Sequence, residues 1–232
     1  MPGSLEYSIW ILSALLEAGV LVCAFLTRSF NRYFTINLYM AASLAVNVLR
    51  YLILVRYGFG SDQYFYCYYY SDAVLTICLY FALMGLYSHV FDEMKAEKYV
   101  RLGATLLLAG TAMFSYSVVQ QSSYRLLTHF VVEMSQNLYF VGLVLTYLLW
   151  ASILKLRETR TRLIHLVLSL GIYFSAFAAN YALRNLYPQL HLIWGYLPPL
   201  LGCLLPLSWA YTFWRLPEEA RLAPSRLAVI PR

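Results

Sequence analysis

Long apolar stretches, separated by short polar or basic segments, recur along the whole chain. About 20 consecutive apolar residues form a helix long enough to cross a bilayer. The pattern therefore predicts an all-α membrane protein, a seven-transmembrane-helix bundle that forms one domain over residues 1–214 and is followed by a short tail at 215–232. The spans are expected at about 7–27, 34–55, 64–88, 100–118, 124–154, 163–184 and 191–214.

Lysine and arginine residues are distributed unequally between the two sets of span ends. Four lie at one set of ends, namely Arg50, Arg56, Arg125 and Arg184, and the rest of the 17 lie at the other. Basic residues concentrate on the cytoplasmic side of membrane proteins. This predicts an N-terminus outside, a cytoplasmic C-terminus and a multi-pass protein of the plasma membrane, and an odd number of spans agrees with it. The basic set is Arg28, Arg32, Lys95, Lys98, Arg101, Lys155, Arg157, Arg160, Arg162, Arg215, Arg221, Arg226 and Arg232.

The composition supports the membrane class and excludes nucleic acid as a partner. The chain is 61% hydrophobic and 12% charged, whereas soluble domains are about 45–50% apolar and about 25% charged. The net charge of +6 does not indicate nucleic-acid binding, because the basic residues lie in the short gaps between apolar runs. The first run contains Glu17 and has no basic segment before it, so we expect it to be retained rather than cleaved as a signal peptide.

One acidic residue lies inside the long apolar stretch 64–90. Asp72 belongs to a series at spacing four, Tyr68, Asp72, Thr76 and Tyr80, and this spacing places the four side chains on one helical face. A carboxylate at membrane depth costs roughly 3 kcal/mol on insertion scales, so such residues normally face the protein interior and pair there. Asp72 is therefore expected to point at other helices of the bundle.

Other spans carry polar stripes that could supply its partners. The fifth span has Arg125, His129, Glu133 and Asn137 at spacing four, which indicates a face buried against other helices. The second span has a similar face. Its members are Tyr39, Ser43, Asn47 and Arg50.

Comparing depth along the spans predicts one polar cluster that opens toward the outer side. We expect Arg50 to pair with Asp72, and Arg184 to pair with Glu133 or Glu17. Such a cluster is either a set of internal staples or a binding site for a small molecule or an ion, and the unequal number of acids and bases favours the site. The candidate ligand-binding residues are Glu17, Asn47, Arg50, Asp72, His129, Glu133, Asn180 and Arg184.

Two cofactor interpretations compete with this one. His129, Glu133, His191 and Asp72 could form a zinc site, although the chain has no HxxxH or HExxH sequence. Haem would need axial pairs such as His129 with His191, or His89 with His165. No nucleophile and base occur at a usable spacing, so the sequence does not indicate an enzyme, and we assign no metal and no cofactor.

The last span contains Pro198, Pro199 and Pro206. Prolines remove backbone donors, so we expect a kink or a break in this helix. Spans 2 and 6 both end in Asn and Arg, and spans 1 and 5 both carry a glutamate near mid-membrane. This hints at two parallel three-span repeats around a central span, as in some small transporters.

In layout alone, with no shared motif, the chain resembles the seven-helix sensory input modules of bacterial signalling proteins, without an attached effector. Retinal proteins need a lysine in the last span, and this chain has none there. Pro188-Gln189 is a single copy in a loop, unlike the helical motif of PQ-loop transporters. The leading hypothesis is a receptor-like sensor that binds a small ligand and signals through a partner protein. The alternatives are a small-solute or proton-coupled transporter, and an accessory membrane subunit without a ligand.

Overall fold

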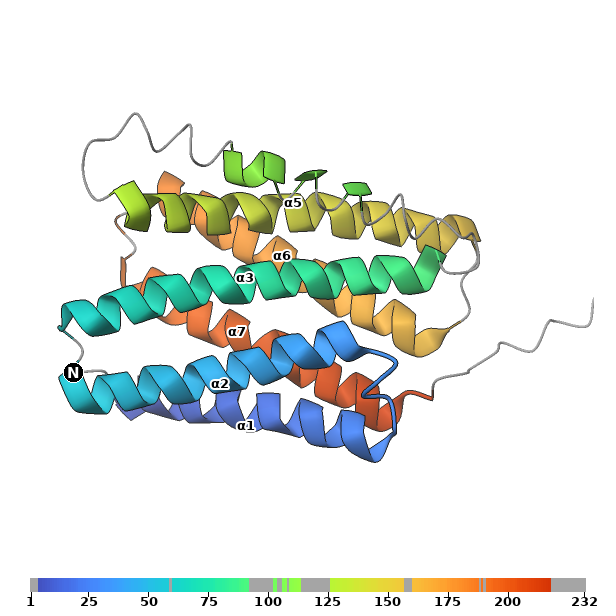
Figure 1. Cartoon of the computed structure of the whole chain (residues 1–232), viewed down its shortest axis with the longest axis horizontal. Helices are drawn as coiled ribbons and strands as arrows, with labels where there is room; N and C mark the ends of the chain where they lie inside the picture. The colour runs from blue at the N-terminus through green and yellow to red at the C-terminus, as the bar shows by residue number, and fades with distance from the viewer. Residues whose placement is uncertain are drawn as a thin grey trace, which may run out of the picture.

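The computed structural model of the chain is a bundle of long helices (Figure 1). It describes residues 4–58, 60–91, 102–103, 106–107, 109–113, 126–156, 160–187, 189 and 191–217, with side chains except at 4–6, 126–133, 156, 185 and 191–196. The long helices of this described part are α1 (Ser4–Leu26), α2 (Phe34–Tyr57), α3 (Asp62–Phe91), α5 (Leu126–Leu156), α6 (Thr161–Leu186) and α7 (His191–Arg215). The predicted fourth span is described only in three short helical pieces, near α5 at the edge of the bundle.

The long helices form a ring. Each packs against two neighbours in the order α1, α2, α3, α5, α6 and α7, and α7 returns to α1. Helix α3 also contacts α6 across the ring, so the interior is narrow. The first and last helices are therefore neighbours, and polar groups on α1, α2, α3, α5 and α6 can share one interior.

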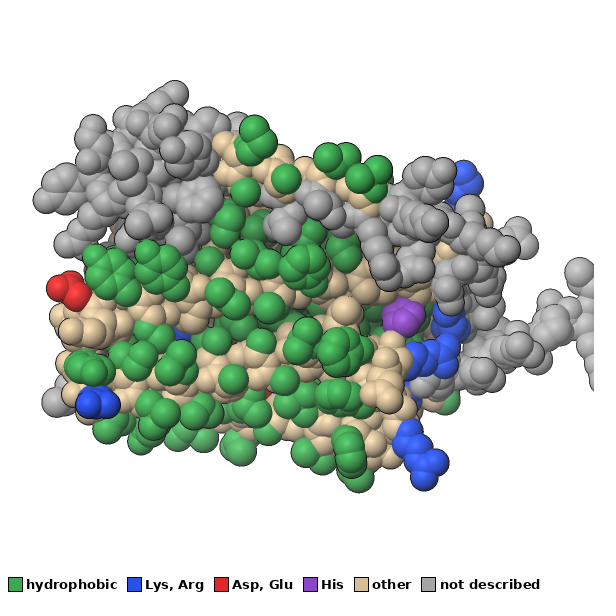
Figure 2. Space-filling model, in the orientation of Figure 1, with side chains coloured by type: hydrophobic (Ala, Val, Ile, Leu, Met, Phe, Trp, Pro, Cys, Tyr) green, Lys and Arg blue, Asp and Glu red, His purple; other side chains and the backbone are tan. Residues whose placement is uncertain are grey.

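The outside of the bundle is apolar along its length (Figure 2). Leu15, Phe25 and Leu154 are 66%, 75% and 68% exposed, respectively, and a continuous apolar exterior of this kind marks contact with lipid. Five helices are long and apolar enough to cross a membrane, by length and composition. They are Tyr7–Leu26, Phe34–Tyr57, Asp62–Phe91, Met134–Lys155 and Thr161–Arg184. The predicted helical membrane class is therefore supported, whereas the count of seven spans and the orientation stay predictions.

Helix α7 continues without a break from His191 to Arg215 and contains Pro198, Pro199 and Pro206. Of the predicted kink or break, the break is therefore wrong, and the kink stays a prediction. Within membrane bundles, neighbouring helices and local adjustments can satisfy the carbonyl groups that a proline releases. Helix α7 packs against both α1 and α6, which supplies such neighbours.

Many hydroxyl groups within the helices are satisfied by the backbone of their own helix. Thr146 donates to the Gly142 carbonyl at 2.7 Å, and Thr212 donates to the Ser208 carbonyl at 2.7 Å. This bond to the residue one turn earlier lets Ser and Thr lie in an apolar environment without a partner on another helix. Polar side chains that are not satisfied in this way are therefore the informative ones.

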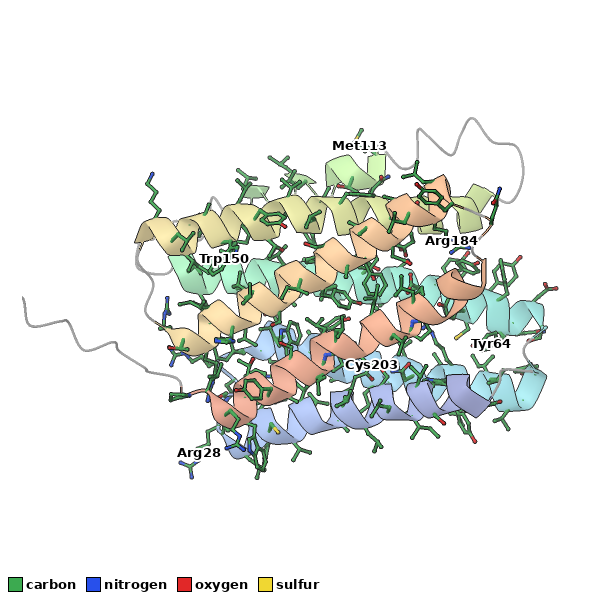
Figure 3. The ribbon with its side chains drawn as sticks, turned by 180° about the vertical axis from the view of Figure 1, so that it is seen from behind. Arg28, Tyr64, Met113, Trp150, Arg184 and Cys203 are labelled. Carbon is green, nitrogen blue, oxygen red and sulfur yellow. The ribbon has the colours of Figure 1, made fainter. Side chains whose placement is uncertain are left out.

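The two ends of the bundle differ in charge and in packing. Figure 3 shows Arg28 at one end, which we call the basic end, and Tyr64 and Arg184 at the other, which we call the opposite end. Large apolar side chains fill the interior toward the basic end. Those at most 1% exposed include Ile36, Met40, Leu83, Leu86, Leu149, Leu163, Trp209 and Phe213.

Candidate functional site

The Glu17 carboxylate on α1 is held by two side chains of α2. Ser43 donates to one carboxylate oxygen at 2.6 Å, and Asn47 donates to the other at 2.7 Å. Trp10 in turn donates to Asn47 Oδ1 at 3.2 Å, and Ser13 makes a further polar contact with Glu17. Glu17 is 5% exposed. Both of its oxygens are engaged, so this carboxylate joins α1 to α2.

Arg50 on α2 reaches α3. Its Nε donates to Ser71 Oγ at 2.8 Å, its guanidinium donates to the Tyr68 carbonyl at 3.0 Å, and the same group lies 4.3 Å from the centre of the Tyr68 ring. The predicted partner, Asp72, is the next residue after Ser71, and it interacts with Arg50 through the electrostatic field. Arg50 therefore lies beside Asp72 but directs its described hydrogen bonds elsewhere.

The Asp72 carboxylate accepts no hydrogen bond from any residue that the structure describes. Asp72 interacts electrostatically with five tyrosines, one on its own helix and four on neighbouring helices. They are Tyr68 on α3, and Tyr39, Tyr139, Tyr173 and Tyr181 on the other helices. These come from α2, α3, α5 and α6. Asp72 thus faces the interior, as the sequence predicts, and there its described neighbours are aromatic side chains together with Arg50, which makes no described hydrogen bond to it.

Exposure falls steadily along the face of α3 that carries Asp72. Tyr68 is 42% exposed, Asp72 is half-buried, Thr76 is 3% exposed and Tyr80 is 1% exposed. Residues at spacing four share one face, so this gradient follows a single line into the bundle. Asp72 therefore lies at the boundary between the exposed and the buried part of this face.

A row of buried tyrosines forms the floor below Asp72. A polar contact joins Tyr39 to Tyr173, another joins Tyr173 to Tyr139, and a third joins Tyr139 to Thr76. The three tyrosines are 7%, 6% and 5% exposed, respectively. Thr76 also donates to the Asp72 carbonyl at 2.9 Å. The floor thus connects α2, α6, α5 and α3 at one depth.

Aromatic rings of α5 and α6 pack closely beside this floor. The Tyr139 ring stacks on Phe177 with centroids 5.0 Å apart, and lies 5.7 Å from the Tyr181 ring. Tyr173 and Phe177 are 4.6 Å apart. Because Tyr181 lies within the field of Asp72, this aromatic group borders the space in front of that carboxylate.

Two buried polar atoms in the same region lack a partner. Asn180 Oδ1 on α6 and Ser135 Oγ on α5 have no hydrogen bond within the part of the chain that the structure describes, and each residue is 3% exposed. Asn180 lies two turns beyond Tyr173 on the same helical face, and Ser135 lies one turn before Tyr139. Both residues are displaced from these tyrosines toward the opposite end, so the two orphan atoms lie between the tyrosine floor and that end. A buried polar atom without a partner costs about 1–3 kcal/mol, which calls for an explanation.

The remaining predicted site residues lie on α5 and α6. Arg184 is exposed at the opposite end, and the described polar partners of Glu17 are Ser43, Asn47, Ser13 and Arg50 rather than Arg184. The alternative pairing of Arg184 with Glu133 stays a prediction. The backbone of His129 and Glu133 lies in α5, but their side chains are outside the described part. Their share in the site stays a prediction.

Among the described residues, no group of three or more His, Cys, Asp or Glu side chains could hold a metal ion. His89, a residue of the haem hypothesis, contacts the Arg32 carbonyl through Nε2 at 2.6 Å and packs edge-on against Tyr33 at 5.3 Å. Its described ring nitrogen is thus engaged within the protein. The side chains of His129 and His191 lie outside the described part.

A second polar group, which the sequence does not predict, lies at the basic end. Its centre is Arg162, which the sequence places among the basic residues between two spans and which is 6% exposed. It donates to Ser29 Oγ at 2.6 Å and to the Leu216 carbonyl at 2.7 Å. It therefore ties the α1–α2 turn and the end of α7 to the start of α6. No signal in the sequence distinguishes this arginine from its basic neighbours.

No protein-family model, curated protein or solved structure matches the chain. A function for this chain therefore has to be inferred from the geometry of the described residues.

Proposed function

We propose that this chain is a receptor-like membrane protein that binds a small ligand at Asp72, which the ligand would reach from the opposite end. The observation that carries the proposal is the contrast between the two interior carboxylates. Glu17 has both oxygens engaged by α2, whereas Asp72 lacks a described hydrogen-bond partner. An ionisable residue within a membrane span is rare, and it is a functional-site hypothesis by default.

The charges of the described interior support an external partner. Arg50 is the cation whose field acts on both Glu17 and Asp72. Two carboxylates against one guanidinium leave an excess negative charge, and a bound ligand would balance it. His129 and Glu133 belong to the proposed site as further lining residues, together with Asn47, Asn180 and the rim residue Arg184.

The closed lower half favours a receptor over a channel or an open carrier. Below the tyrosine floor, the interior is occupied by Leu83, Trp209 and Phe213, each with no exposed surface. A ligand that enters from the opposite end therefore stops at the floor. A receptor of this kind signals by changing helix packing, which a partner protein then detects.

Ligand binding can be tested with purified full-length protein in lipid nanodiscs. The melting temperature is measured against a broad panel of small molecules: amines, carboxylates, sugars, nucleosides and neutral aromatics. We expect at least one class to raise the melting temperature of the wild type and of Asp62→Asn, but not of Asp72→Asn. Asp62 is a matched control because it is an exposed acid at the start of the same helix.

The unliganded variants give a second readout. Asp72→Asn should leave the melting temperature unchanged or raise it, because it removes a desolvated charge that accepts no described hydrogen bond. If Asp72→Asn instead lowers the melting temperature strongly and no panel member binds, Asp72 is a structural staple, and an accessory subunit without a ligand becomes the better interpretation.

A transporter is the second candidate, and the tyrosine floor is the observation that favours it. The polar contacts from Tyr39 through Tyr173 and Tyr139 to Thr76 form a row of hydroxyl groups that could exchange protons between Glu17 and Asp72. Proton flux or solute uptake into proteoliposomes separates the candidates. Flux that Tyr139→Phe abolishes would favour transport.

The proposed location is the plasma membrane, with the opposite end outside. Support comes from the basic residues at the helix ends that lie with Arg28 at the basic end (Figure 3), namely Arg32, Lys155, Arg160 and Arg215, since positive residues concentrate on the cytoplasmic side. In a variant with its cysteines replaced by serine, a membrane-impermeant maleimide should label Gln63→Cys in intact cells. The same reagent should label Asn31→Cys only after permeabilisation, and the reverse pattern would invert the orientation.

A further inference from the structure

The geometry points to a protonated amine, an organic ammonium ion with a small apolar or aromatic body, as the ligand of the Asp72 site. This inference rests on the proposed function, because it names the chemical class of the ligand that the site would bind. Three features of the described residues carry it: the charge, the orphan acceptor and the aromatic surroundings.

The charge of the site selects a cation. Arg50 stacks on the Tyr68 ring and bonds to Ser71 and to the Tyr68 carbonyl, so its described donors are directed away from the Asp72 oxygens. An anionic ligand would have to approach Asp72 against its charge. An ammonium ion instead balances the charge of the carboxylate and donates hydrogen bonds to it.

The orphan acceptor selects a cation that carries N–H groups. Asn180 Oδ1 is buried, has no partner among the described residues and lies on the α6 face that also carries Tyr173. Tyr173 lies within the electrostatic field of Asp72, which places this face of α6 toward Asp72. A protonated amine can donate one N–H to the Asp72 carboxylate and another to Asn180 Oδ1, whereas a quaternary ammonium ion has no hydrogen to donate.

The aromatic surroundings select an organic body over a metal ion. Within the described part, no three His, Cys, Asp or Glu side chains converge to hold a metal ion. The ring of Tyr139 packs against two others, with its centroid 5.0 Å from that of Phe177 and 5.7 Å from that of Tyr181. Aromatic faces attract organic cations, and small-ligand sites combine an apolar lining with a few fixed polar groups. The tyrosine floor limits the ligand to a small one.

The test uses four probes that share one benzyl ring and differ in the head group: benzylamine, benzyltrimethylammonium, benzyl alcohol and benzoate. Binding to the full-length protein in nanodiscs is measured by the shift of the melting temperature and by titration calorimetry. We expect benzylamine to bind the wild type and Asp62→Asn equally. Loss of a hydrogen bond to a charged group should weaken its binding to Asp72→Asn by about ten- to hundredfold.

Asn180→Leu separates the donor argument from the charge argument. We expect this variant to weaken benzylamine binding while leaving benzyltrimethylammonium binding unchanged, because only the first probe can donate to Asn180 Oδ1. Equal weakening of both probes would overturn the assignment of Asn180. The melting temperature of each variant without ligand shows whether it is folded.

The outcomes distinguish the inference from the function on which it rests. If benzoate or benzyl alcohol binds more tightly than benzylamine, and Asp72→Asn abolishes that binding, the ammonium class is wrong but the site stands. If benzylamine binds Asp72→Asn as well as the wild type, or no probe binds, the ammonium inference is overturned. The broad ligand panel then decides separately whether Asp72 binds any ligand at all.

Discussion

Replacing Glu17 tests whether this carboxylate is a structural link between α1 and α2. Glu17→Ala removes both described acceptors from Ser43 and Asn47. Ser43 can turn its hydroxyl to a carbonyl one turn earlier in α2, so it loses little. The Asn47 side chain has no such option. Its oxygen accepts the Trp10 indole N–H, which fixes the orientation of the amide, so its NH2 group stays directed at the place that the Glu17 carboxylate occupied.

The magnitude follows from this difference. A buried donor left without a partner costs about 1–3 kcal/mol, and an interhelical hydrogen bond within a membrane protein contributes about 0.6 kcal/mol on average. We therefore expect Glu17→Ala to lower the free energy of unfolding by about 2–3 kcal/mol. Glu17→Gln should cost less, about 1 kcal/mol, because its amide can face the Ser43 oxygen while its carbonyl accepts from Asn47.

The assay is unfolding by SDS in mixed micelles, followed by tryptophan fluorescence. The expected order of stability is wild type, then Glu17→Gln, then Glu17→Ala, with Asp72→Asn at or above the wild type. If Glu17→Ala is as stable as the wild type, or Asp72→Asn is the less stable variant, the assignment of one carboxylate to structure and the other to binding is refuted.

Two further predictions concern packing and the basic end. Gly142→Ala should lower the free energy of unfolding by about 1–3 kcal/mol, because a Cβ there would lie 2.5 Å from a ring carbon of the fully buried Phe174; Gly19→Ala, where a Cβ meets open space, is the control, and equal SDS midpoints would contradict the packing argument. Arg162→Met should lower it by about 1–3 kcal/mol, because the Leu216 carbonyl at the end of α7 loses its guanidinium donor and Ser29 loses its bond to α6. Limited proteolysis should then cut the C-terminal segment faster, and an unchanged rate would mean that this arginine does not hold α7.

The sequence was sufficient to predict most helices, because a helix that crosses the bilayer needs about 20 consecutive apolar residues, and such runs can be counted in the sequence. The predicted span 34–55 corresponds to Phe34–Tyr57, and 163–184 corresponds to Thr161–Leu186. The fate of the prolines in α7 was not predictable, since proline propensity reflects an isolated helix and α7 lies between two neighbours. Packing decides whether the released carbonyls find substitutes.

For the site, depth was predictable and rotation was not. Counting residues along each span put Glu17 at the level of Asn47, and the structure bonds these two. Counting could not show that Ser71, rather than Asp72, receives the Arg50 Nε–H, because adjacent residues on a helix differ by about 100° in direction. Tyr139 was missed for the same reason, since it lies outside the stripe that contains Asn137.

The described interior places two carboxylates at comparable depth under opposite conditions, and this difference carries the functional argument. A bundle that needed only internal links would satisfy both, since Ser and Asn side chains suffice for Glu17. Around Asp72, the nearest cation is engaged with Tyr68 and Ser71, the described neighbours are tyrosines, and the Asn180 oxygen also lacks a described donor. Two acceptors without described donors are unfavourable unless a donor arrives from outside. On the proposed function, a ligand with N–H groups would supply it and would link α3 to α6, two helices that touch only across the ring. Binding would then tighten the bundle across its interior, and in the proposed receptor this tightening would carry the signal to the basic end.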